Sequence, residues 1–285
     1  MNMLRDALTV AVLALIFSCK YPDKYNPLLE PRGPDICGLE IILPVSRIYE
    51  NETTLAQAMA ILSSGKKTPL AAGEVVWDSL NTDVALVDAD GTVRGLSTGT
   101  GEIRIRMGDL TAEHEIVVER LIDYSRIKLS EVFYDPAGSD DGREFIEIYN
   151  DNEYGCDISG MQITDGSPAS TPFVFPAGSS INAKSYAVVA QSKDGFFNLF
   201  GQQPDYSGFT FALNNNGETI WFIKQDGSPV DAVYIKGGSL EYPAPESWGS
   251  VTFPSAQTGN SVQRIIGSNT DSFSDWASGP PSPWR

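Results

Sequence analysis

The feature that most constrains this chain is a set of short runs in which apolar and polar residues alternate and which turn residues interrupt. The run Glu144–Asn150 reads Glu-Phe-Ile-Glu-Ile-Tyr-Asn. In an extended strand its alternation places Ile146 and Ile148 on one face and Glu147 on the other. Gly138–Gly142, just before it, is rich in turn-forming residues. With 26 Gly and 18 Pro in the chain, this pattern favours an all-β fold with many turns.

Length and charge narrow the class of protein further. A chain of 285 residues suits two domains, because single hydrophobic cores rarely exceed ~250 residues. The formal net charge is −17, from 20 Lys and Arg against 37 Asp and Glu, and the longest basic run is Lys66-Lys67. Binding to nucleic acid depends on clustered Lys and Arg that displace counterions from the phosphates. Nucleic acid is therefore not expected as a partner.

The first residues read as an export signal. The apolar run Ala7–Phe17 has 11 residues, too few to cross a bilayer, which needs about 20. The sequence Ile16–Cys19, which overlaps the end of this run, resembles a bacterial lipobox, in which a small residue precedes a Cys that is lipidated and becomes the mature amino terminus. That resemblance implies a signal peptide at 1–18 and a lipid on Cys19. An ordinary signal peptide with an incidental Cys is the alternative.

The segment after the expected lipid anchor is rich in Pro. Residues 19–37 are therefore predicted to be an extended, Pro-stiffened tether. Acyl chains on Cys19 would hold the protein stably at a membrane, since each buried CH₂ contributes ~0.8 kcal/mol. We expect a lipid-anchored protein of the bacterial cell envelope, on either its periplasmic or its outer face.

A first domain is predicted for residues 38–119. Ile103, Ile105 and Met107 alternate with two Arg residues, which is typical of a half-buried strand. Asp88–Gly91 has the composition of a hairpin turn, and Trp77 is expected at the centre of a sandwich. The whole run resembles the bacterial immunoglobulin-like domain of group 2. The matching positions are Trp77, Ser79, Asn81, Val84, Ala85, Val87, Asp88, Gly91, Val93, Gly95 and Gly99.

The stretch Thr54–Gly73 before Trp77 is longer than is usual in this family. We expect it to form either a long hairpin or a short helix.

A hinge at 120–126 and a second domain at 127–285 complete the predicted order. Beyond Glu144–Asn150, the second domain contains a polar bend, a buried strand at Tyr186–Ala190, a turn at Asp226-Gly227 and a closing strand at Ser261–Arg264. Taken with Asp275-Trp276, these motifs resemble the lamin tail domain. That family implies an immunoglobulin-like β-sandwich, so the chain is predicted to contain two such sandwiches in tandem.

Few residues here are suited to catalysis. His114 is the only histidine, and its parity with Ile116 and Val118 places it at the margin of the first core. The chain has one His, and no Cys lies beside it in the sequence. The residues needed for a zinc site, or for a Ser-His-Asp or Cys-His nucleophile, are therefore not present together. We therefore expect a protein that is not an enzyme.

An acidic cluster on one turn is the candidate metal site. Asp135, Asp140, Asp141 and Glu144 offer several oxygen ligands to a Ca²⁺ ion, the only cofactor that the sequence suggests. The alternative is a solvated loop whose Asp residues cap turns.

A Pro-rich loop is the candidate binding surface. Tyr242 and Trp248 lie in the run Glu241–Gly249, and aromatic residues on stiff loops are typical of binding surfaces. Alternatively, Trp248 covers one end of the sandwich. Trp284 is either a further member of this aromatic set or part of a disordered tail.

Two cysteines remain once Cys19 carries a lipid. Cys37 and Cys156 can form a disulfide in an exported chain, which would join the tether to the second domain. Each can instead be a small apolar filler.

These observations predict a non-catalytic, membrane-anchored surface lipoprotein. It would present immunoglobulin-like modules for adhesion or envelope structure, with a protein or polysaccharide as ligand. An accessory subunit that positions a separate hydrolase and a calcium-dependent carbohydrate-binding module are the alternatives.

Overall fold

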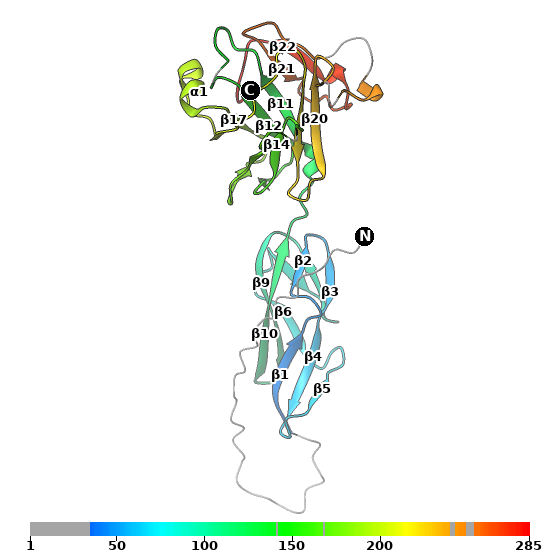
Figure 1. Cartoon of the computed structure of the whole chain (residues 1–285). Helices are drawn as coiled ribbons and strands as arrows, with labels where there is room; N and C mark the ends of the chain where they lie inside the picture. Colours follow the sequence, from blue (N-terminus) through cyan, green and yellow to red (C-terminus); the bar gives the residue numbers. More distant parts are fainter. Residues whose placement is uncertain (1–34, 141, 168, 240–242, 249–253) are drawn as a thin grey trace, which may run out of the picture. The chain divides into compact units, whose positions relative to one another are not determined.

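The computed structural model describes residues 35–140, 142–167, 169–239, 243–248 and 254–285. Contacts divide the chain into two compact units, Met1–Leu121 and Ile122–Arg285 (Figure 1). Strands dominate both units, and the predicted all-β fold is confirmed. Among the described residues no helix is long and apolar enough to cross a bilayer.

Ten strands are described in the first unit, and they form three sheets in the orders β1-β4-β5, β2-β10-β9-β6 and β3-β8-β7. The strands are β1 (Ile36–Ile42), β2 (Arg47–Tyr49), β3 (Thr53–Leu55), β4 (Gln57–Leu62), β5 (Lys67–Pro69), β6 (Val76–Ser79), β7 (Ala85–Val87), β8 (Thr92–Gly95), β9 (Gly99–Met107) and β10 (Leu110–Glu119).

The core of the first unit follows the alternation of its longest strands. β9 and β10 pair antiparallel, and Ile103 and Ile105 are fully buried while Arg104 and Arg106 point to the other face. The stretch Thr54–Gly73 forms the β4–β5 hairpin, one of the two predicted alternatives.

The turn at Asp88–Gly91 joins β7 and β8, as the sequence predicts. Gly91 has a φ of +89°, and a Cβ atom there would lie 2.5 Å from the carbonyl oxygen of Ala56, so only glycine fits. The sequence predicts Trp77 at the centre of the sandwich, but the structure places it elsewhere. It lies on β6, an edge strand of its sheet, and is only partly buried.

The second unit contains twelve described strands, one α-helix and three short 3₁₀ helices. The strands are β11 (Ile127–Phe133), β12 (Phe145–Asn150), β13 (Cys156–Asp157), β14 (Gln162–Thr164), β15 (Phe173–Val174), β16 (Ser180–Ile181), β17 (Ser185–Ala190), β18 (Tyr206–Ser207), β19 (Glu218–Ile223), β20 (Pro229–Ile235), β21 (Ser261–Arg264) and β22 (Trp276–Gly279). The helices are η1 (Tyr124–Arg126), α1 (Lys193–Phe200), η2 (Glu246–Trp248) and η3 (Phe273–Asp275).

Two larger sheets enclose the main core of the second unit. One has six strands in the order β18-β17-β12-β11-β21-β22, and the other has four in the order β15-β14-β19-β20. A register shift in β11 between Leu129 and Glu131 leaves Ser130 as an extra residue, a β-bulge. Because of this bulge, Leu129 and Val132 both face the core although they are three residues apart.

The outer face of the six-stranded sheet carries the helix α1, which the sequence analysis did not predict (Figure 1). Ser192 caps its first turn by accepting a hydrogen bond from the Gly195 N–H, and Gly201 ends it in a left-handed conformation. Phe196 and Phe200 on α1 pack against the sheet, in a second apolar cluster separate from the main core.

Candidate binding site in the second unit

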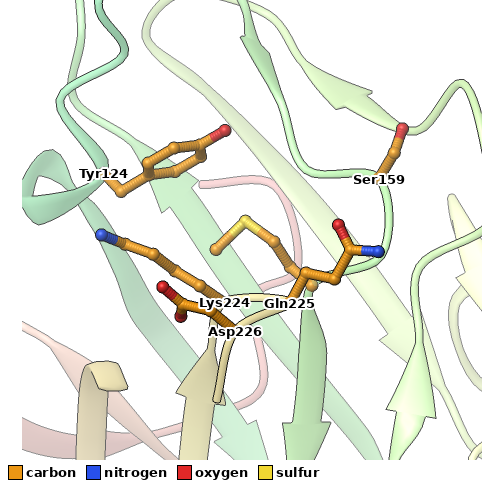
Figure 2. A pocket seen from close by; sticks show the side chains of 6 residues that line it. Tyr124, Ser159, Lys224, Gln225 and Asp226 are labelled. Carbon is orange, nitrogen blue, oxygen red and sulfur yellow. The ribbon is translucent and has the colours of Figure 1, made fainter. Parts of the chain in front are cut away.

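A pocket with a volume of about 430 Å³ lies in the second unit (Figure 2). Three segments that are far apart in the sequence line it. Tyr124 comes from η1, Ser159 and Met161 from the link between β13 and β14, and the rest from the turn between β19 and β20. The lining residues of that turn are Lys224, Gln225 and Asp226.

Hydrogen bonds within the unit fix the walls of the pocket. The Tyr124 hydroxyl donates to the carbonyl oxygen of Asp157 over 3.0 Å, which holds the ring at the mouth. The Ser159 hydroxyl accepts from the N–H of Gly178 at 3.0 Å. The predicted turn at Asp226-Gly227 is present, and the Ser228 hydroxyl donates to the Asp226 carboxylate at 2.6 Å.

The charges at the pocket are one ammonium group and one carboxylate. The Lys224 Nζ lies 5.5 Å from the centre of the Tyr124 ring (Figure 2), a cation–π arrangement, and it forms no ion pair with a described carboxylate. Hydrogen bonds from Ser228 lower the pKa of Asp226 below its usual value, so this carboxylate is ionised at neutral pH. Burial raises the pKa of Tyr124, and the charge of Asp157 adds to the shift.

This arrangement offers both apolar and polar surfaces to a ligand. Met161 is buried and supplies an apolar floor, and the Tyr124 ring supplies an apolar wall. Around them stand an ammonium, an amide and a carboxylate. Aromatic walls with a few converging polar groups are typical of sites for small polar molecules or for the ends of polymers.

The two units match two known domain families. The model of the bacterial Ig-like domain (group 2) matches residues 44–117, and that of the Lamin Tail Domain matches residues 122–237. The chain carries a group 2 bacterial Ig-like domain followed by a lamin tail domain. The predicted pair of families and their order are confirmed. The pocket lies in the lamin tail domain, and all its lining residues fall within the matched range.

Three solved structures share a distant likeness. Domains 4 and 5 of the S-layer protein SbsC match at 15% identity and a TM-score of 0.27, covering 66% of this chain and 92% of that one. A DUF4876 family protein from Bacteroides thetaiotaomicron matches at 11% identity and a TM-score of 0.35, covering 79% and 82%. The adhesin InvE of Yersinia pseudotuberculosis matches at 12% identity and a TM-score of 0.26, covering 79% and 67%. Curated proteins gave no match.

Two of the predicted calcium ligands, Asp135 and Asp140, both accept hydrogen bonds from the same amide nitrogen in the lamin tail domain. The Asn215 amide donates to Asp140 at 2.8 Å and to Asp135 at 3.5 Å, and Thr258 donates to Asp135 at 2.8 Å. Glu144 points elsewhere: it is buried and accepts the Leu213 N–H at 3.1 Å. Asp141 lies outside the described residues. Within them no group of three or more acidic, His or Cys side chains could hold a metal ion. The alternative, side chains that fix loops, fits the contacts of Asp135 and Asp140.

The predicted aromatic loop is only partly described. Trp248 is 5% exposed and packs edge-to-face on Tyr234, with ring centres 4.8 Å apart. It therefore covers the end of the sandwich, as the second of the two interpretations predicts, and does not stand on a binding surface. Tyr242 lies outside the described residues. Trp284 packs on α1, in neither of the two roles expected for it.

The predicted disulfide between Cys37 and Cys156 is not formed. Cys156 is fully buried in the core of the lamin tail domain, where its sulfur contacts the side chains of Asn150 and Asn152. Cys37 lies on β1 of the Ig-like domain. Cys156 thus fills space in the core, as in the alternative interpretation, but it also makes polar contacts there. Cys19, the expected lipidation site, lies outside the described residues. His114 is half-buried on β10 next to the core strands, as expected.

A set of buried carboxylates in the lamin tail domain was missed by the sequence analysis. Glu147 was expected on the polar face of its strand, yet it is 1% exposed, and burial raises its pKa to about 8. Glu144 is similar, with a pKa of about 8, and burial raises the pKa of Glu218 to about 6. The oxygens of all three accept hydrogen bonds from the protein's own N–H and O–H groups. These carboxylates are parts of the fold, and none lines the pocket.

Proposed function

We propose that this protein is a non-catalytic, lipid-anchored component of a bacterial cell envelope that presents its Ig-like and lamin tail domains for adhesion or envelope structure. The pocket formed by Tyr124, Met161 and Lys224 is the observation that carries the proposal. It displays an aromatic face, an apolar floor and the Lys224 ammonium group, which forms no ion pair with a carboxylate of the described residues. The resemblance of Ile16–Cys19 to a lipobox supports the anchor.

The acidic groups of the lamin tail domain support a binding role over a catalytic one. Raised carboxylate pKa values often mark active sites, because an enzyme uses such groups as acids and bases. In this domain the carboxylates with raised pKa values accept hydrogen bonds from backbone N–H groups and hydroxyls that hold strands and loops together. The pocket has a different lining. Its polar groups suit contact with an anionic or strongly hydrogen-bonding polymer.

The anchor is tested by labelling cells with an alkyne-tagged fatty acid. We expect the wild-type protein to incorporate the label and Cys19→Ala to lose it. Label on the Cys19→Ala variant, or none on the wild type, would contradict lipidation at this position.

The pocket is tested by capture from detergent-solubilised envelope with the protein from residue 20 onward. Lys224→Met removes the ammonium, and Lys193→Met, at an exposed position of α1, makes the same chemical change outside the pocket. We expect the bound protein or polysaccharide to fall at least tenfold with Lys224→Met and to stay unchanged with Lys193→Met. Equal capture by both variants would remove the pocket from the proposal.

The same experiment separates the alternatives. A captured hydrolase would favour the accessory subunit. Capture of carbohydrate that is abolished by EGTA would favour calcium-dependent binding.

A further inference from the structure

The segment that follows β22, residues 280–285, crosses the outer face of the six-stranded sheet. It is fixed there by the sheet's acidic side chains, which accept its backbone N–H groups. Ser282 donates to Glu131 over 2.9 Å, and Trp284 donates to Glu147 over 2.5 Å. Glu131 and Glu147 face each other in register on β11 and β12. We call residues 280–285 the strap.

The Trp284 side chain secures the far end of the strap. Its ring packs edge-to-face on Phe196 of α1 with centres 5.5 Å apart, and its indole N–H donates to Asp205 over 2.8 Å. The backbone of Trp284 has a φ of +64°, a left-handed conformation that is rare for a bulky aromatic residue. Such a conformation persists only where surrounding contacts impose it. The strap is therefore held by its docking contacts and not by its own preference.

The charged groups that act on Glu147 are the carboxylates of Glu131 and Asp205, and the neutral Tyr186 phenol lies near them. Glu131 faces it from β11, Asp205 from the loop before β18, and the Tyr186 phenol from β17. The ion pairs of the described Lys and Arg side chains include none with Glu131 or Glu147. Lys128, on the same strand as Glu131, forms ion pairs with Asp231 and Asp271.

The charged residues of α1 and of the strap do not offset the negative charge at Glu131 and Glu147. On α1 the charged residues Lys193 and Asp194 are exposed, as is Arg285 on the strap.

A negative charge on Glu147 is therefore costly while the strap covers it. Ionisation would place a charge away from water, beside Glu131 and Asp205. Within the described residues, the hydrogen bonds that offset this cost come from Ser130 and Trp284. When Glu147 is protonated, its proton can be donated to the Ser130 oxygen, which lies 2.7 Å away, so the neutral form is also hydrogen-bonded. Burial raises the pKa of both Glu131 and Glu147, which agrees with this balance.

We propose that the strap is a pH-dependent cover, docked on the sheet while Glu147 is protonated and released when Glu147 ionises. Release restores water to the two carboxylates and relieves the left-handed backbone at Trp284. It also uncovers Phe196 and the aromatic side chains beside it on the outer face. The lamin tail domain would then expose an apolar surface in mildly alkaline surroundings and cover it at acidic pH.

The test follows the Trp284 indole resonance by NMR in ¹⁵N-tryptophan-labelled protein from residue 20 onward, between pH 5.5 and 9.5. Trp284→Phe assigns the signal among the five tryptophans. We expect one transition with a midpoint near pH 8, from a docked signal to one typical of an exposed indole. Glu147→Gln keeps the size and the acceptor oxygen but cannot ionise, and should keep the docked signal throughout.

Two outcomes would overturn the proposal. One is a Trp284 signal in the wild type that does not change over this range. The other is the same transition in Glu147→Gln, which would show that another group drives it. A second readout is the binding of an apolar fluorescent dye. We expect at least a threefold rise in dye fluorescence between pH 6 and 9 in the wild type, a pH-independent high value in Trp284→Ala, and a low value throughout in Glu147→Gln.

Discussion

The two sandwiches of this protein handle polar groups in opposite ways. In the described part of the chain, every buried polar or charged side chain belongs to the lamin tail domain, and the buried core of the Ig-like domain is entirely apolar. The Ig-like domain places its carboxylates near the surface, as in the pair of Arg120 with Glu50 and that of Arg104 with Asp78. The buried polar set of the lamin tail domain is Ser130, Glu131, Glu144, Glu147, Asn150, Asn152, Thr164, Asp165, Ser179, Glu218, Thr219, Asp231, Ser261 and Asp275.

This difference has an energetic consequence. A surface ion pair contributes ~0–1 kcal/mol, so its loss changes little. A buried charge that loses its partner keeps its desolvation cost, so a single substitution there is expensive. The stability of the lamin tail domain should therefore be more sensitive to substitution and to pH than that of the Ig-like domain.

The largest effect is expected from Arg264→Met. Arg264 contacts the buried Asp231 at 2.6 Å and the carbonyl oxygen of Leu129 at 2.7 Å, and it stacks on Trp276. Its removal leaves Asp231 with the Leu129 N–H at 2.8 Å and with Lys128, at 3.6 Å, as its one cationic partner among the described residues. We expect the free energy of unfolding of the lamin tail domain to fall by ~3–5 kcal/mol, measured by urea denaturation and tryptophan fluorescence.

The matched control is Arg104→Met in the Ig-like domain. Its partner Asp78 is half-exposed and also contacts Arg106 at 2.8 Å, so the expected loss is at most ~1 kcal/mol. Because Trp77 is the only tryptophan of the Ig-like domain, a Trp77→Phe background makes fluorescence report the lamin tail domain alone. Hydrogen exchange in β9 and β10 then follows the Ig-like domain. Equal losses in both domains would break the comparison.

The second prediction concerns opposite responses to pH. Glu144 and Glu147 have folded pKa values of about 8 and Glu218 of about 6, all raised by burial from 4.5. A raised folded pKa gives stability that is complete below the unfolded pKa and is lost as pH rises through the folded value. The lamin tail domain should lose on the order of a few kcal/mol of stability between pH 5 and 9.

The stability of the Ig-like domain should depend on pH with the opposite sign and over a different pH range. A hydrogen bond from Arg120 lowers the pKa of Glu50, so its contribution is present above the unfolded pKa and is lost as pH falls through the folded one. We expect little change between pH 5 and 9 and a decline below pH 4.5. The double variant Glu144→Gln and Glu147→Gln should flatten the alkaline decline of the lamin tail domain. A decline that persists in it would assign the effect to other groups.

Local patterns predicted the strands, while contacts between distant segments decided what the sequence analysis missed. Alternation correctly placed Ile103 and Ile105 in the core, and Gly91 marked a turn, because these features depend on neighbouring residues. The burial of Glu147 depends on Trp284, which is 137 residues away. Alternation alone gives the face of a strand, and it does not show what covers that face.

The candidate pocket was beyond local reasoning for the same reason. Tyr124, Ser159 and Lys224 come from three segments that only the folded domain brings together. The helix α1 did leave a signal, with a capping Ser192, a terminating Gly201 and two Phe residues four apart. At eight residues the pattern is too short to stand out from the strands around it.

The smallest of the three effects tests how α1 is seated on the outer face, a feature that the Ig-like domain lacks in its described part. In a free helix, Gly195→Ala would be stabilising by ~1 kcal/mol. In this fold a Cβ atom at Gly195 would lie 1.9 Å from the carbonyl oxygen of Gly142, so α1 must shift away from Phe145. We expect the cost of this clash to exceed the gain in helix propensity. The free energy of unfolding, measured by urea denaturation, should therefore fall by ~1–3 kcal/mol. Gly155→Ala is the control, because its Cβ atom would meet no atom closer than 3.6 Å. A Gly195→Ala protein as stable as the wild type would mean that α1 is free to move off the sheet, and that helix packing adds little to the difference between the two domains.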